Sequence, residues 1–302
     1  MKCFQFKISV IIVFVIALLL SGSSCIGRKD YSENTIIHNY QIKDLCKEKV
    51  RIGIIDTGID PDIIVLKGKI LSGWNFVDNT NKTFNSPLDD YHGTYIATTI
   101  ASIVPNLEIL PIKCMRGSGG TKDNIIKGIQ YAIAQGVKII NCSWNYEGYD
   151  NRIYELIKNN PDVLFIVSSS NYSVNVDEEE IGLCSYDCDN IIAVMACDKN
   201  GDKYGATGYG SQSIDVASPG VDIEVTISDQ HTAIISGSSV ATAFVTAEAG
   251  FLLSICPDLS VKDLKRCILS SVSVKDDLQG YCLTSGIINY DDCISYLIDN
   301  KL

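Results

Sequence analysis

Basic residues and histidines are scarce in this sequence. Lysine and arginine together number 25 against 36 aspartates and glutamates, and the formal net charge is −11. The basic residues are scattered, which excludes a nucleic-acid-binding patch and favours a peptide or a small molecule as substrate. The three histidines, His38, His92 and His231, show no cysteine–histidine spacing typical of a zinc site. No metal or other cofactor is predicted, calcium included, because acids in loops are usually solvated.

The sequence also lacks a long linker, an internal repeat and a low-complexity tract. Its 302 residues are 46% hydrophobic, which is enough to bury one substantial core. These features exclude a chain of several independent domains. We therefore expect one monomeric globular domain over residues 48–302.

The N-terminus has the layout of a secretory signal over residues 1–24. Two lysines precede an apolar run over residues 10–20, and small polar residues follow it. Counted from Ile8, the apolar segment would span about 20 Å as a helix, which is short of the roughly 30 Å hydrocarbon layer of a membrane. The pattern predicts a secreted protein without stable membrane association, and a retained signal anchor is the alternative. Residues 25–47 are expected to form a short N-terminal segment.

Twelve cysteines fit an oxidising compartment, in which some of them would pair. Three of them, Cys114, Cys142 and Cys197, end apolar runs that look like buried strands, so packed thiols and disulfides both remain open for them. The better disulfide candidates lie in polar or C-terminal segments. They are Cys184, Cys188, Cys256, Cys267, Cys282 and Cys293. The sequence does not give their pairing.

Short apolar runs alternate with helical patterns along the chain. Strands are predicted at residues 50–56, 107–114, 137–143, 163–169 and 191–197, and helices at 92–104, 122–136 and 151–160. A last short strand and a helix are expected in the C-terminal tail. Nearly continuous apolar strands separated by helices predict an α/β fold, with a mostly parallel central sheet and helices on both faces. The carboxyl edge of such a sheet collects ligands, and it would carry Asp56, Asn171 and the segment after Cys142.

Two adjacent serines, Ser238 and Ser239, begin a predicted helix in "IISGSSVATAFV". A serine needs a base to remove its proton, and a histidine base works best beside a carboxylate that fixes its tautomer. His92, in "YHGT", begins one predicted helix, and Asp56, in "IIDTG", ends a buried strand. Taken singly, each of these residues also fits an ordinary helix cap or turn.

The order of the motifs adds a resemblance. The segments "IGIIDTGID", "HGTYIATTIASI", "RGSGGT", "IVSSSN" and "ISGSSVATAFV" follow one another as in the subtilisin-like serine protease family, the subtilases. The resemblance runs from about Lys47 to about Leu297. It implies a subtilisin-like fold and a serine endopeptidase that acts on peptides or proteins. This family usually carries a long inhibitory prodomain, and residues 25–47 are too few for one.

The resemblance also assigns roles to single residues. Asp56 matches the orienting aspartate, His92 the general base and Ser239 the nucleophile, while Ser238 stands where the family usually has threonine. Asn171 matches the side-chain donor of the oxyanion hole. A helix that begins near Ser239 agrees with this assignment, because its free N–H groups favour an oxyanion.

The family binds its substrate as an added strand between two segments. Residues 117–120 match the first of these segments and 143–146 match the second, where "SWNY" replaces an apolar residue and two glycines. Ser170 stands where a glycine usually lines the pocket for the residue before the scissile bond. The implied substrate-binding residues are Gly117, Ser118, Gly119, Ser143, Trp144, Asn145 and Ser170. These segments bring no carboxylate to the pocket, so we expect an unbiased or apolar preference before the scissile bond and not a basic one. Asp187 in "CSYDC" is the nearby acid that could favour a basic residue instead.

Three other functions were weighed. An α/β-hydrolase esterase needs a histidine after the serine, and none follows His231. A papain-like protease built from Cys142, His231 and Asn289 has the wrong spacing. A secreted pseudoprotease that keeps the fold as a protein-binding module is the remaining alternative, favoured by the altered "SWNY" and opposed by the intact Asp56, His92, Asn171 and Ser239.

Overall fold

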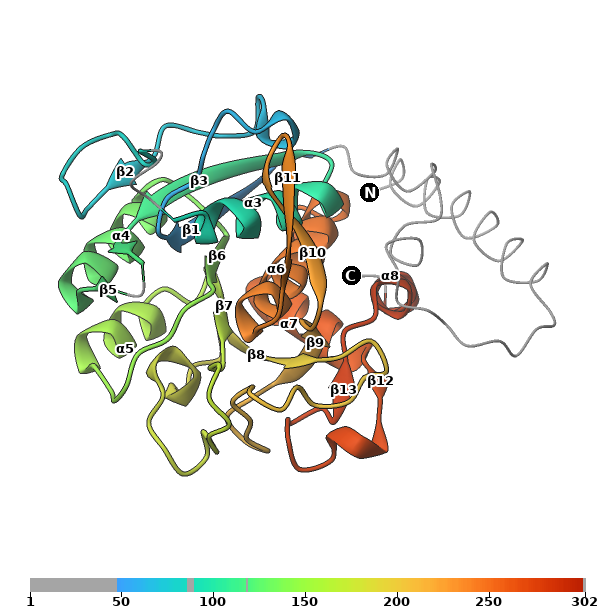
Figure 1. Ribbon diagram of the computed structural model, residues 1–302. Helices are drawn as coiled ribbons and strands as arrows, with labels where there is room; N and C mark the ends of the chain where they lie inside the picture. Colours follow the sequence, from blue (N-terminus) through green and yellow to red (C-terminus); the bar gives the residue numbers. More distant parts are fainter. Residues whose placement is uncertain (1–47, 86–89, 118, 301–302) are drawn as a thin grey trace.

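The computed structural model describes residues 48–85, 90–117 and 119–300 (Figure 1). The predicted signal sequence and the N-terminal segment over residues 25–47 lie outside the described residues, as does Ser118.

A nine-stranded sheet crosses the described part of the chain in the order β12-β13-β9-β8-β7-β6-β1-β3-β2. All neighbouring strands are parallel except β12 and β13, which are antiparallel. The strands of the sheet are β1 (Val50–Asp56), β2 (Trp74–Asn75), β3 (Leu107–Lys113), β6 (Ile139–Cys142), β7 (Leu164–Ser168), β8 (Ile191–Cys197), β9 (Val216–Pro219), β12 (Ser273–Val274) and β13 (Gly286–Ile287). Two hairpins lie outside the sheet, and they are formed by β4 (Met115–Arg116) with β5 (Gly119–Gly120) and by β10 (Ile223–Ser228) with β11 (His231–Ile235).

Helices cover both faces of the sheet (Figure 1). The helices are α3 (His92–Ile103), α4 (Lys122–Ala134), α5 (Asn151–Lys158), α6 (Ser238–Ile255), α7 (Val261–Ser270) and α8 (Tyr290–Asp299), with 3-10 turns η1 (Ile64–Leu66), η2 (Gly182–Ser185) and η3 (Asp276–Leu278). Successive side chains of a strand point to opposite faces. On β1, Ile52 accordingly lies against Gly250 of α6, whereas Ile55 lies against Gly128 of α4.

Helix α6 is the central helix of the fold. It packs on α3 and along strands β6 to β9, and nearly all of its residues are buried. Within the described residues it is also the one helix long and apolar enough to cross a membrane. Since a helix that is apolar all round belongs in a core, its composition is explained by its burial inside the protein.

The structure confirms the predicted α/β fold class and most of the predicted elements. Strand β1 has the predicted bounds, and the C-terminal strand and helix are present as β13 and α8. Strand β9, the β10–β11 hairpin and helix α7 were not predicted from the sequence. The hairpin has exposed and half-buried positions without a continuous apolar run, so its pattern did not stand out from a loop.

The direction of the strands places the site. Because β1, β6 and β7 are adjacent and parallel, the residues that follow them leave the sheet at the same edge. Asp56, Ser143 and Ser169 lie there, and α3 and α6 both begin at this edge.

Candidate active site

Asp56 and His92 form a hydrogen-bonded pair. The Nδ1 atom of His92 lies 2.7 Å from Oδ1 of Asp56, and the backbone N–H of Thr57 donates to the same oxygen at 2.7 Å. Asp56 is fully buried, and its Oδ2 has no hydrogen-bond partner among the described residues. A buried carboxylate beside Nδ1 favours the imidazole tautomer with its proton on Nδ1, which leaves Nε2 as the proton acceptor.

Gly93 explains how helix α3 comes so close to β1. A Cβ atom at Gly93 would lie 2.3 Å from the carbonyl oxygen of Gly58 and 3.1 Å from Cβ of Asp56. The Gly93 N–H also donates to Oγ1 of Thr57 at 3.2 Å. Any larger residue would push the start of α3 away and separate His92 from Asp56.

The surroundings of His92 raise its pKa above the ordinary value of 6.5. Burial opposes the charged form, but the charge and hydrogen bond of Asp56 and the charge of Asp90 outweigh it. Asp90 also accepts a hydrogen bond from the backbone N–H of His92 at 3.0 Å. The imidazolium is therefore stabilised by two carboxylates.

Ser239 lies in the first turn of α6, but its hydroxyl is not turned toward the histidine. It donates to the carbonyl oxygen of Ser143 at 2.8 Å, and the Ser143 hydroxyl donates to the carbonyl oxygen of Ser239 at 2.9 Å. Within the part of the chain that the structure describes, Ser239 and His92 share no hydrogen bond. The predicted acid–base pair is thus formed, whereas the predicted base–nucleophile contact is not made in this arrangement.

Asn171 is held by its carbonyl end. Its Oδ1 accepts from the backbone N–H of Ser238 at 2.9 Å and from the Ser238 hydroxyl at 3.1 Å. Gly237 leaves room for this contact, because a Cβ there would lie 3.1 Å from Oδ1 of Asn171. The Nδ2 atom of Asn171 would lie 3.2 Å from the same Cβ, and the structure gives it no hydrogen-bond acceptor among the described residues.

The residues that hold these groups could not be identified from the sequence. Ser238, which stands where the family usually has threonine, fixes the side-chain amide of Asn171. Asn141 donates to Oγ of Ser143 at 2.9 Å, and Thr246 donates to Asn141 at 2.8 Å. A buried asparagine at the end of an apolar strand was the available signal for this support.

The predicted substrate-binding residues fall into three places. Gly117 and Gly119 belong to the exposed β4–β5 hairpin. The Trp144 indole donates to the carbonyl oxygen of Ile55 at 2.7 Å, and Asn145 donates to the carbonyl oxygen of Ser169 at 3.0 Å. The Ser170 hydroxyl donates to the carbonyl oxygen of Tyr172 at 2.7 Å. Segments 143–146 and 168–171 therefore lie side by side next to Ser239.

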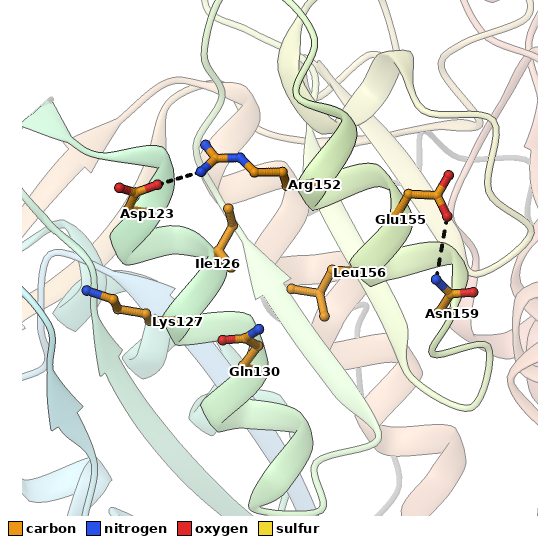
Figure 2. A pocket seen from close by; sticks show the side chains of 8 residues that line it. All are labelled: Asp123, Ile126, Lys127, Gln130, Arg152, Glu155, Leu156 and Asn159. Carbon is orange, nitrogen blue, oxygen red and sulfur yellow. Dashed lines mark hydrogen bonds and ion pairs between the residues drawn. The ribbon is translucent and has the colours of Figure 1, made fainter.

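A hollow in the described part of the chain lies away from this edge of the sheet. A groove of about 480 Å³ runs between α4 and α5 and is crossed by an ion pair of 2.8 Å between Arg152 and Asp123 (Figure 2). Its lining combines charged and amide side chains with the half-buried Ile126 and Leu156, and it contains no nucleophile next to a base. We therefore assign the chemistry to the edge of the sheet and not to this groove.

The described residues hold no group of three or more histidine, cysteine or acidic side chains that could bind a metal ion.

Cys184, Cys188, Cys267, Cys282 and Cys293 are free thiols in the structure, so the disulfides predicted for them are not confirmed. Asp187 is exposed, while its neighbours Tyr186 and Cys188 are buried.

Three features define the class of subtilisin-like serine endopeptidases. They are the parallel sheet, the Asp56–His92 pair at its edge and Ser239 in the first turn of the central helix. The model of the Subtilase family matches residues 47–284. The chain belongs to the Subtilase family.

Curated relatives agree with this placement. Thermitase of Thermoactinomyces vulgaris is 33% identical over 218 residues, which are 68% of this chain and 75% of thermitase. The thermophilic serine proteinase of Bacillus sp. strain AK1 is 33% identical over 67% of this chain, and the match spans about half (52%) of that proteinase. Subtilisin DY of Bacillus licheniformis is 27% identical over 80% of this chain and 89% of its own.

Solved structures show the same fold. A cold adapted subtilisin-like serine proteinase has a TM-score of 0.68 at 23% identity and covers 78% of this chain and 88% of its own. A chain from the assembly of the subtilase cytotoxin SubAB has a TM-score of 0.78 at 22% identity. The match covers 88% of this chain and 96% of that chain.

Proposed function

We propose that the protein is a secreted serine endopeptidase that uses Asp56, His92 and Ser239 as its triad and Asn171 as an oxyanion donor. The observation that carries the proposal is the 2.7 Å contact between His92 Nδ1 and Asp56, because it orients the other ring nitrogen as a base. A peptide or protein is the substrate, and no cofactor takes part.

The proposed reaction begins when the Ser239 hydroxyl turns from the Ser143 carbonyl to Nε2 of His92. The imidazole takes the proton as Oγ attacks the peptide carbonyl carbon, and the oxyanion accepts from Nδ2 of Asn171 and the N–H of Ser239. His92 then gives the proton to the leaving amine as the C–N bond breaks. Water, deprotonated by His92, attacks the acyl ester. The bond between the acyl carbon and Oγ then breaks, His92 returns the proton to Oγ of Ser239, and the acid leaves.

A fluorophosphonate probe tests this proposal, because it reacts only with an activated serine. We expect the folded protein to be labelled once per chain. The second candidate is a pseudoprotease that binds proteins without cleaving them, and the Ser239–Ser143 hydrogen bonds favour it because they occupy the nucleophile. A folded protein that the probe does not label would support this second candidate and contradict the first.

On the acid side of the pH profile, kcat/KM is expected to rise above pH 6.5; this rise is the acid limb. His92 must be neutral to accept the serine proton, and its pKa is raised, so kcat/KM should develop only as the pH passes this raised pKa. Asp90→Asn removes one stabilising charge and should move the limb to lower pH. Asp123→Asn on α4 serves as the control and should leave the limb in place, because Asp123 pairs with Arg152 and is not among the charges that shift the pKa of His92. A maximum near pH 4 would show that His92 is not the base.

We also propose that residues 1–24 are removed as a signal and that Cys267 and Cys293 form a disulfide during export. Their sulfur atoms are 3.2 Å apart, and both residues are buried between α7 and α8. The two thiols would lose two electrons and two protons to the disulfide of a thiol–disulfide oxidoreductase.

Peptide mapping of the exported protein under non-reducing conditions should find a new N-terminus after residue 24 and the Cys267–Cys293 cross-link. Cys282, whose sulfur lies 3.9 Å from the Thr284 hydroxyl and 4.0 Å from the Gly286 carbonyl oxygen, should remain a thiol. An N-terminus at Met1 would favour the retained anchor, and two alkylated thiols at 267 and 293 would contradict the disulfide.

A further inference from the structure

Two chain segments border the place where the scissile carbonyl must lie. Strands β6 and β7 are paired in register, Cys142 with Val167, so the residues that follow them leave the sheet side by side (Figure 1). Ser239 contacts the first segment through Ser143, and Asn171 ends the second. A peptide carbonyl held between Ser239 and Asn171 therefore lies over the gap between segments 143–146 and 168–171.

The side chain of Asn145 crosses this gap. Its Nδ2 donates to the carbonyl oxygen of Ser169 at 3.0 Å, which joins the two segments directly. Trp144 does not fill the gap, because its indole is bonded to the carbonyl oxygen of Ile55 on β1. Asn145 is half-buried and Ser169 is fully buried, so the bond lies within the protein and not at its outer rim.

A loop that contains Cys184 and Tyr186 contacts both of these segments. The Cys184 thiol donates to the carbonyl oxygens of Ser168 at 3.2 Å and Ser169 at 3.4 Å. The hydroxyls of Tyr146 and Tyr186 lie 2.5 Å apart, which ties this loop to the first segment. Asn145 thus bridges the gap directly. Cys184 contacts segment 168–171, and Tyr186 contacts segment 143–146 through Tyr146.

We propose that Asn145 makes the enzyme specific for a small residue, such as glycine, alanine or serine, before the scissile bond. This inference rests on the proposed function. A large side chain could enter only by breaking the Asn145–Ser169 bond, which would leave the buried Ser169 carbonyl with the weak thiol donor of Cys184. A small side chain enters without this loss. The expected discrimination is roughly 10- to 100-fold in kcat/KM, the range that one pocket contact supplies.

The test uses peptides that differ only in the residue before the scissile bond, which is alanine, leucine, phenylalanine or arginine. The wild-type enzyme should cleave after alanine at least about 10-fold faster in kcat/KM than after phenylalanine. Asn145→Gly removes the side chain that bridges the gap. It should therefore raise the ratio of kcat/KM for the phenylalanine peptide to kcat/KM for the alanine peptide by about 10- to 100-fold. Asn159→Gly makes the same chemical change at the exposed end of α5 and should leave the ratio unaltered.

The wild-type profile alone can overturn the inference, so the test does not depend on the folding of the variant. Cleavage after phenylalanine, leucine or arginine as fast as after alanine would contradict it, and preference for arginine would point to Asp187. An unchanged ratio in folded Asn145→Gly would contradict it as well. If the protein gave one of these contradicting results and was still labelled by the fluorophosphonate probe, only the small-residue specificity would be overturned. If the folded wild-type protein showed neither labelling nor cleavage, the proposed function would be overturned as well.

Discussion

Ser239→Ala is expected to abolish peptide hydrolysis, with kcat lowered about 10⁶-fold, the loss that removal of the nucleophile causes in subtilisin. The reason is that the Ser239 hydroxyl supplies the attacking oxygen in the proposed reaction, whereas the neighbouring Ser238 hydroxyl is bonded to Asn171. Alanine should be tolerated by the fold, because the Ser239 hydroxyl donates only to the Ser143 carbonyl. Turnover of a peptide substrate and fluorophosphonate labelling measure the effect, and thermal unfolding checks the fold.

Ser238→Ala is the matched control for this prediction. Ser238 is the adjacent residue, yet its hydroxyl contacts Asn171 and Ser168 and takes no part in the attack. Labelling should persist in this variant, with turnover reduced much less than in Ser239→Ala, since the Ser238 N–H still holds Asn171 at 2.9 Å. Equal loss of labelling in both variants would show that Ser239 is not the unique nucleophile.

Asn171→Ala is expected to lower kcat by about 10²–10³ while changing KM little. In subtilisin, removal of one oxyanion donor has an effect of this size. The Nδ2 group gains its full interaction only when negative charge develops on the substrate oxygen, so the loss belongs to the transition state. Separate measurement of kcat and KM on one peptide tests the prediction.

Tyr172→Ala provides the comparison for Asn171. Tyr172 is the next residue and its side chain is 76% exposed, so truncation should leave both kinetic constants close to their original values. If Asn171→Ala raised KM without lowering kcat, Asn171 would be a ground-state contact. A loss no larger than that of Tyr172→Ala would remove Asn171 from the oxyanion hole.

The core of the fold could be predicted from the sequence because its strands are buried on both faces. Continuous apolar runs such as 50–56 and 191–197 have few alternatives to central parallel strands, and the helices between them follow from their periodicity. Strand β9 and the β10–β11 hairpin could not be predicted in the same way. Their residues are short runs or partly exposed, so their structure depends on neighbours that are distant along the chain.

The same limit applies to the site. Asp56 and His92 could be paired from the sequence because their motifs follow one another in the order found in the subtilases, whereas each motif alone also fits an ordinary cap or turn. The direction of the Ser239 hydroxyl could not be predicted, since it depends on a carbonyl 96 residues away. The bridge from Asn145 to Ser169 is equally invisible in the sequence, where asparagine in "SWNY" only marks the absence of a glycine.

The contact of α3 with the turn after β1 separates what can vary in this protein from what cannot. At Gly93, backbone touches backbone without an intervening side chain, so the spacing of acid and base contains no adjustable part. Three of the proposed peptide-binding residues, Gly117, Gly119 and Asn145, lie outside this contact, so they can change without disturbing it. New specificities can therefore arise on an unchanged catalytic frame. The orientational entropy of the base is lost once, when the chain folds, and not at every turnover.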